Sequence, residues 1–262
     1  MLELYHSINS VCAQKVRVVL AEKELEYREH LMTLRGDQFD PHYMKLNPNA
    51  VVPTLVHDGR PVIESSVILY YLDEAFPRPP LMPRESHERA YVRLFNKLID
   101  EYVHNSCTIL TFATAFRPWF AGLSGEELER KLAQAPSKQR TEYKRDVVLH
   151  GLDSKYVRDA VAYHRKLLEM MDTSLARGPW LAAETFSLAD AAVIPYILRL
   201  ELLRLHPMWE RLPRIDAWYE RVRGRASVRK ELLDRMGPED RAPFEKLDGD
   251  PWPKVEKLAW EC

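Results

Sequence analysis

The sequence has few cysteines, few glycines and no long apolar run. Among its 262 residues are nine glycines and only three cysteines, Cys12, Cys107 and Cys262. So few, widely spaced cysteines do not build a disulfide framework, and they favour a reducing compartment, so we expect a cytoplasmic protein. No apolar stretch approaches the roughly 18 residues of a membrane span. The first residues lack the basic and apolar segments of an export signal, so we expect neither export nor a membrane partner.

The sequence is also poor in net charge and in nucleotide-binding or metal-binding motifs. Its formal net charge of −1 argues against nucleic acid as the main partner. There is no G-x-G-x-x-G and no phosphate loop. The nine histidines show no H-x-x-x-H or Cys/His ligand spacing, so we expect no metal site. Apolar residues make up 46% and charged residues 29%, an ordinary globular composition with room for one large or two modest domains.

The first 76 residues show a mixed α/β pattern. Residues 2–5 alternate like a strand, 12–23 have helical periodicity, and 27–32 resemble a second strand. Asp40-Pro41 predicts the start of a short helix that ends before Asn47-Pro48. A strand, a helix and a strand in this order imply a parallel pair, to which a hairpin then adds antiparallel strands. This order predicts a thioredoxin-like arrangement of about 75 residues.

The hairpin covers residues 51–63. Asp58-Gly59 separates two runs rich in β-branched residues, which is a strong turn signal. Pro53 stands at the mouth of the first strand, where an edge-strand proline costs no ladder hydrogen bond. Ser65 follows the hairpin, and we predict that it caps a helix whose positive end can bind a carboxylate.

Ser10 and Cys12 lie at the start of the helix predicted at 12–23. Lys15 occupies the third position after Cys12, which excludes an internal Cys-x-x-Cys dithiol, so a reacting thiol can instead arrive with a ligand. Lowering a thiol pKa by two units takes roughly 2.7 kcal/mol. A hydroxyl donor to an anion supplies roughly 1.5–3 kcal/mol and a helix end roughly 0.3–1, so Ser10 with the helix dipole suffices. From the residues alone, a plain helix cap is the usual role of a serine such as Ser10, and a cysteine such as Cys12 is more often a small buried apolar residue than a reactive thiol.

These segments together resemble the glutathione transferases. The resemblance rests on residues 10–17 (SVCAQKVR), 46–55 (LNPNAVVPTL), the pair Glu64-Ser65 and 186–190 (FSLAD). The Ser-x-Cys spacing looks most like that of zeta-class enzymes and the bacterial tetrachlorohydroquinone reductive dehalogenase. The long second domain is similar to that of the bacterial lignin β-etherases. The resemblance implies a thioredoxin-like domain followed by an all-helical domain, glutathione as co-substrate, a hydrophobic electrophile and a homodimer.

The resemblance also implies roles for single residues. Ser10 matches the hydroxyl that stabilises the glutathione thiolate, and Cys12 matches the cysteine that resolves a mixed disulfide in the dehalogenase. Pro53 matches the family's cis-proline, and the backbone of Val52 would pair with the tripeptide as an added strand does. The remaining matches are Glu64 and Ser65, which correspond to the pair that holds the γ-glutamyl group.

The sequence departs from the family pattern at one position of this site. Many relatives carry Lys or Gln two residues before the cis-proline, where this sequence has Val51. The glycyl carboxylate of glutathione then needs another partner, and Gln38, His42 and Lys45 are candidates.

A proline-rich stretch at 77–86 predicts a linker between a glutathione-binding domain at 1–76 and a helical substrate domain at 87–262. We expect one long helix from 87 to 116. Aromatic residues gather at the end of this helix and just after it: Phe112, Phe116, Trp119 and Phe120. They either line a pocket for an aromatic substrate or pack as ordinary core. Residues 121–155 are strongly charged, and we interpret them as an insertion with a helix near 125–132. The insertion partly covers the site, extends a dimer surface or is a solvated excursion.

Further along, Ser187 and Asp190 form a capping box before a buried helix expected at 191–205. More helix is expected at 157–176 and 218–225. The tail from Gly237 contains four prolines, so we expect it to be loop-rich, with Trp252 and Trp260 packing back on the body.

Three functions follow. The first is a transferase that ionises the glutathione thiol near Ser10 and directs it at a small, aromatic electrophile. The second is glutathione-dependent reductive dehalogenation or ether cleavage with Cys12. The third is a non-catalytic binding module that keeps the fold.

Overall fold

The computed structural model describes residues 1–133, 138–247 and 249–260, and Cys262 and residues 134–137 of the predicted insertion lie outside them. The chain begins with a four-stranded sheet in the order β2-β1-β3-β4. Its strands are β1 (Leu2–His6), β2 (Arg28–Leu31), β3 (Thr54–His57) and β4 (Arg60–Val62). β1 runs parallel to β2 and antiparallel to β3, and β3 runs antiparallel to β4. This confirms the predicted thioredoxin-like order.

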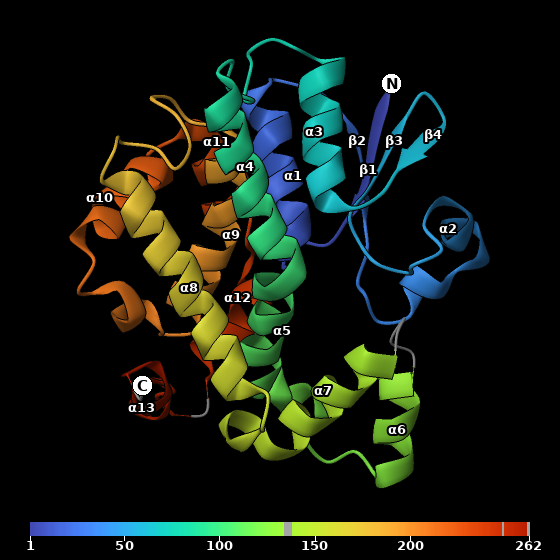
Figure 1. Cartoon of the computed structure of the whole chain (residues 1–262). Helices are drawn as coiled ribbons and strands as arrows, with labels where there is room; N and C mark the ends of the chain where they lie inside the picture. The colour runs from blue at the N-terminus through green and yellow to red at the C-terminus, as the bar shows by residue number, and fades with distance from the viewer. Residues whose placement is uncertain (134–137, 248, 261–262) are drawn as a thin grey trace.

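Local turn and cap chemistry sets the elements around the sheet. Asp58 and Gly59 both have positive φ, 49° and 76°, which matches the twist of the β3–β4 hairpin. The side chain of Asp40 accepts a 2.8 Å hydrogen bond from the His42 amide and so caps α2 (Pro41–Leu46). Figure 1 shows α1 (Val11–Glu22) and α3 (Ser65–Ala75) between the sheet and the later helices, with α2 on the far side.

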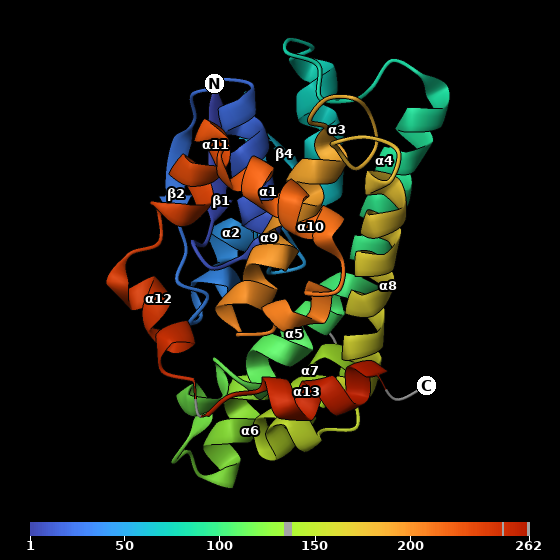
Figure 2. The ribbon, with the colours of Figure 1, turned by 90° about the vertical axis from the view of Figure 1, so that its left-hand side faces the viewer.

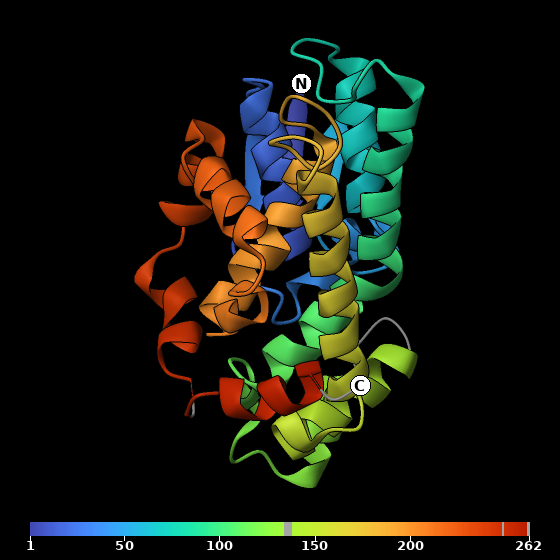
Figure 3. The same ribbon diagram turned by 60° about the vertical axis from the view of Figure 1, so that its left-hand side comes forward.

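The rest of the described chain is helical. After α4 (Ser86–Leu98) and α5 (His104–Ala113) come α6 (Gly125–Ala133), α7 (Lys138–His150), α8 (Val157–Leu175), α9 (Leu188–Leu202), α10 (Pro213–Arg223), α11 (Ala226–Val228), α12 (Pro238–Glu245) and α13 (Trp252–Trp260). Short single-turn helices lie at Asp37–Phe39, Arg117–Phe120, Gly151–Asp153, His206–Trp209 and Arg229–Leu233. In Figure 2, α8 runs along one side of the molecule, and in Figures 2 and 3 α13 crosses its lower end.

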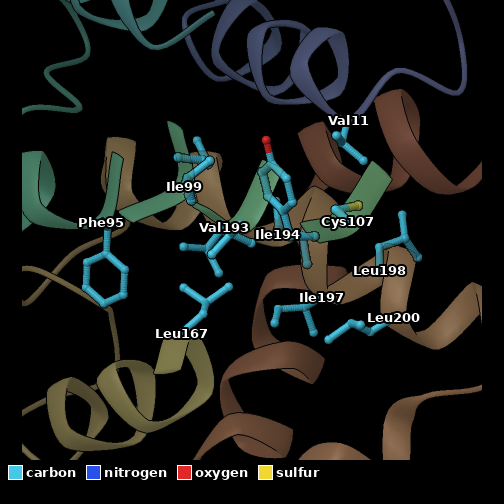
Figure 4. Packing of buried hydrophobic residues seen from close by; sticks show 14 of the residues in the cluster. Val11, Phe95, Ile99, Cys107, Leu167, Val193, Ile194, Ile197, Leu198 and Leu200 are labelled. Atoms are coloured by element: carbon cyan, nitrogen blue, oxygen red, sulfur yellow. The ribbon is translucent and has the colours of Figure 1, made fainter. Parts of the chain in front are cut away.

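Helix α9 is the centre of the core. The predicted capping box is present: the Ser187 hydroxyl accepts from the Ala189 amide, and the Asp190 carboxylate accepts from the Ser187 amide at 2.9 Å. Because these bonds close the first turn, α9 starts at Leu188, three residues earlier than expected. Figure 4 shows side chains of α9 packed among residues from α1, α4, α5 and α8; the labelled ones include Val193, Ile194, Ile197, Phe95 and Leu167.

The expected single helix over 87–116 is wrong in detail. A π-helical turn at Ile99–Val103 separates α4 from α5, and the helix ends at Ala113. Phe116 follows in a short turn, where its amide bonds the carbonyl of Thr111. Such π turns widen a helix by one residue and re-aim the side chains that follow, here His104.

The tail was expected to be loop-rich, and this is also wrong. It forms α12 and α13, because Pro238 stands at the first position of α12 and needs no amide partner there. Helix α13 packs on α8, with the Arg165 guanidinium donating to the carbonyl of Ala259 at 2.6 Å. Among the described residues, no helix combines the length and the apolar character needed to cross a bilayer.

Candidate functional site

The site is built around the N-terminus of α1, which follows directly from β1 and a polar loop. Ser10 caps this helix, since its hydroxyl oxygen accepts a 3.3 Å hydrogen bond from the amide of Ala13. Accepting that bond uses a lone pair and leaves the O–H free to donate. Capping and anion stabilisation are therefore compatible roles for the same hydroxyl.

Cys12 is the second residue of α1 and is half-buried. Its sulfur lies 3.4 Å from Nδ1 of His104 and 3.9 Å from the hydroxyl of Tyr196. Burial alone raises a thiol pKa, but the charge and hydrogen bond of His104, with smaller effects of Lys15 and Ser65, lower the pKa of Cys12 to about 6. A thiol with these neighbours is a thiolate at neutral pH, the reactive form.

His104 and its neighbours come from distant parts of the chain. His104 begins α5, directly after the π-helical turn, and lies 92 positions from Cys12 in sequence. Its Nε2 lies 3.2 Å from the Arg140 guanidinium of α7, and its Nδ1 lies 3.4 Å from the Tyr196 hydroxyl of α9. Sequence reasoning missed all three residues, and no local pattern marks them.

Lys15 fastens this corner to the neighbouring helices. Its buried ammonium donates to the Ser66 hydroxyl of α3 at 2.7 Å and lies 3.5 Å from the carboxylate of Asp100 in the π-helical turn. Ser66 in turn donates to Asp100 at 2.8 Å. Because a cation, a hydroxyl and a carboxylate satisfy one another, α1, α3 and the π-helical turn are held in fixed register around Cys12.

The second corner of the site lies at Pro53. The peptide bond between Val52 and Pro53 is cis, which the resemblance had implied. No hydrogen bond from the described residues reaches the backbone of Val52, so no protein group among them satisfies its N–H and C=O.

The predicted cap of α3 needs a correction. Glu64, not Ser65, precedes the helix, and its φ of 67° turns the chain out of the hairpin one residue earlier than expected. A left-handed backbone at a non-glycine residue costs about 1–3 kcal/mol, so the surrounding contacts must hold Glu64 in place. Ser65 is therefore the first helical residue, buried, with its hydroxyl near Cys12. The Glu64 carboxylate accepts from the Asn49 side chain at 3.3 Å.

Two candidates for the glycyl carboxylate lie on α2, which packs next to this corner because the Tyr43 hydroxyl donates to the Val51 carbonyl at 2.6 Å. His42 and Lys45 are exposed on α2, and the side-chain oxygen of Gln38 accepts from the Gly36 amide. Their role stays a prediction. Among the described residues no group of three or more His, Cys, Asp or Glu side chains is placed to hold a metal ion.

An aromatic cluster, made of Phe112, Phe116, Trp119 and Phe120, lies at the end of α5 and in the short helix that follows it. Phe112 packs edge-on against Phe116 and is tilted against Phe120, and Phe116 stacks on Trp119 at 4.0 Å between centroids. Phe112 and Phe120 are half-buried and Trp119 is exposed, so part of the cluster faces outward. The buried Arg199 links this cluster to the Ser10 loop by donating to the Asn9 carbonyl at 2.6 Å.

Comparisons with known proteins agree across the chain. Residues 9–75 match the family described as "Glutathione S-transferase, N-terminal domain", and residues 139–226 match "Glutathione S-transferase, C-terminal domain". Protein LigF of Sphingobium sp. is 26% identical over 91% of this chain and 95% of its own length. Glutathione S-transferase Z1 of Arabidopsis thaliana is 50% identical, but over 34% of this chain and 41% of the relative, so the chain spans about two fifths of that protein.

A solved structure shows the same fold. The crystal structure of the β-etherase LigF superposes with a TM-score of 0.78 at 24% identity, covering 89% of this chain and 99% of that one.

Proposed function

The chain belongs to the glutathione S-transferase family, whose enzymes use glutathione as co-substrate, and on that premise we propose that it directs the glutathione thiol at a small, aromatic electrophile. The observation that carries the proposal is the proximity of two helix starts: Ser10 caps α1, and the buried Ser65 at the start of α3 lies next to Cys12. The cis bond before Pro53 also supports the proposal. The tripeptide would lie beside Val52 as an added strand, with its γ-glutamyl group at Glu64 and Ser65.

In this mode Ser10 is a hydrogen-bond donor and not a nucleophile. Its free O–H and the N-terminus of α1 stabilise the thiolate of glutathione, and binding both reactants side by side supplies proximity. The aromatic cluster of Phe112 and Phe120 offers the apolar wall against which the electrophile would lie.

A second function is favoured by the contact between Cys12 and His104. In reductive dehalogenation, glutathione first displaces halide from an aryl halide to give an aryl thioether. The Cys12 thiolate then attacks the thioether sulfur, forming a disulfide with glutathione and releasing the aryl group, which takes a proton. A second glutathione regenerates Cys12 and leaves as glutathione disulfide, so two glutathiones reduce one carbon–halogen bond.

A panel of aryl halides, quinones and β-aryl ethers with glutathione tests both functions. Ser10→Ala should lower kcat/KM about tenfold or more, because it removes one hydroxyl donor to an anion. Ser10→Thr keeps both cap and hydroxyl and serves as the matched control. Turnover of all electrophiles at the wild-type rate in Ser10→Ala would contradict the proposed role of Ser10.

Cys12→Ser separates the two chemistries. In the transferase mode it should turn over at a rate close to wild type. In the reductive mode it should release the aryl thioether of glutathione in place of the reduced arene, which mass spectrometry of the products distinguishes.

Family likeness also leads us to propose a homodimer and a reducing compartment such as the cytoplasm, where Cys12 stays a thiol. Light scattering of the purified protein tests the dimer.

A further inference from the structure

Helix α7 places two basic side chains, Arg140 and Lys144, against one face of α5. Arg140 contacts His104 through a 3.2 Å separation of their nitrogens, and the ammonium of Lys144 stands 4.7 Å above the ring centre of Phe112. Arg140 and Lys144 are one turn apart on α7, and His104 and Phe112 are two turns apart on α5, so each pair shares a helix face. Since Cys12 contacts His104, this cationic face adjoins the thiol.

Lys144 lacks the anion that a half-buried ammonium usually has. Among the described residues no carboxylate lies within ion-pair distance of it, whereas Lys15 faces Asp100 and Arg145 faces Glu129. Burial, and to a smaller extent the charge of Arg140, lower the pKa of Lys144 to about 8. A desolvated cation without a counter-ion is costly, and the ring of Phe112 offsets only part of that cost.

The ring beneath Lys144 belongs to the aromatic cluster. Phe112 and Phe120 are half-buried, tilted against each other with centroids 6.0 Å apart, and Lys131 of α6 stands over Phe120 at 5.6 Å. Helices α6 and α7 therefore present cations to an apolar, aromatic surface. An aromatic ring with an acidic substituent matches this arrangement, because its ring can pack on the phenylalanines and its acidic group can pair with the cations.

We propose that Lys144 and the face of Phe112 form a subsite for the acidic group of an aromatic electrophile, either a carboxylate or a phenolate on the ring. The inference rests on the proposed function, and it assigns helices α6 and α7 a part in substrate selection. The acidic group pairs with Lys144, the ring lies on the aromatic cluster, and the reacting carbon points along α5 toward Cys12 and the glutathione thiol.

Binding and turnover of a chloronitrobenzoate and its neutral carboxamide test the subsite. Calorimetry without glutathione should show that wild type prefers the benzoate, and that Lys144→Met loses about tenfold in benzoate affinity but not in carboxamide affinity. Lys144→Arg should keep the preference. The matched control is Lys166→Met on α8, an exposed lysine that also stands over an aromatic ring, Tyr102, and it should change nothing.

Three results would overturn the proposal. The first two are equal affinity of wild type for the benzoate and the carboxamide, and an equal loss of affinity for both in Lys144→Met. The third comes from parallel titrations with glutathione and its glycyl ethyl ester: Lys144→Met loses affinity for glutathione alone and not for the ester or the benzoate. The last result would assign Lys144 to the glycyl carboxylate of glutathione. Wild type that prefers the benzoate yet conjugates neither ligand would contradict the proposed function and leave the subsite standing.

Discussion

Replacing His104 by Asn should abolish the unusual acidity of Cys12. The pKa of this thiol is lowered from 9.0 to about 6, although burial acts in the opposite direction. Three units correspond to about 4 kcal/mol of preference for the thiolate. His104 contributes the two largest lowering effects, its charge and its hydrogen bond, so without it the pKa of Cys12 should rise back toward that of an ordinary thiol.

The assay is the pH dependence of Cys12 alkylation by iodoacetamide, followed by intact mass. Burial raises the pKa of Cys107 to about 11, so that thiol does not compete at neutral pH, and Cys262→Ser is placed in every variant. The pH midpoint of the alkylation rate is a better measure than the rate at a single pH. For a full return of three units, the thiolate fraction at pH 7 falls about 90-fold, but the more basic thiolate is roughly 20-fold more nucleophilic, so the rate changes only about fourfold.

Tyr196→Phe is the matched control, because it removes a hydroxyl 3.9 Å from the sulfur without removing a charge. It should shift the midpoint far less than His104→Asn does. A wild-type midpoint near 9, or an unchanged midpoint in His104→Asn, would refute the assignment of His104 as the group that ionises Cys12.

Two further predictions concern folding. Asp190→Asn should lower the free energy of unfolding by about 2–4 kcal/mol, measured by urea titration, because both oxygens of the buried carboxylate accept hydrogen bonds. One oxygen accepts from the Leu181 amide and the Trp218 indole, and the other accepts from the Ser187 amide and hydroxyl; the Asn nitrogen that replaces one oxygen cannot accept from an amide. Glu245→Gln on the surface should leave stability unchanged. His164 is buried and its pKa is lowered by burial to about 4, so the unfolded state binds its proton first as the pH falls below about 6.5. Wild type should therefore lose about 3 kcal/mol between pH 7 and 4 that His164→Gln does not lose, and equal slopes for the two proteins would count against this.

Features fixed by local chemistry could be predicted from the sequence. The Asp58-Gly59 turn and the cap of α2 at Asp40 depend on residues within four positions of one another. The capping box of Ser187 and Asp190 is equally local, and all three are present. The fold class follows from these signals together with the order of strands and helices, and the comparisons confirm it.

Features that need tertiary packing could not be predicted. His104 and Tyr196 reach Cys12 from 92 and 184 positions away, and nothing near either residue marks a site. The π-helical turn that aims His104 has no sequence signal that periodicity detects. Prolines in the tail were interpreted as helix breakers, although Pro238 stands where a helix tolerates proline best.

The insertion at 121–155 was more than a solvated excursion. Its helix α7 packs against α5, buries Tyr143 and brings Arg140 to His104. Charge composition alone favours exposure, because it does not show which side of an amphipathic helix meets a partner.

A crystal structure with reduced glutathione bound tests the central claim most directly. The account predicts that the tripeptide pairs with the backbone of Val52, that its γ-glutamyl group meets Ser65, and that its sulfur lies within hydrogen-bond distance of the Ser10 hydroxyl. Glutathione bound elsewhere, or with its sulfur turned away from Ser10 and Cys12, would contradict it.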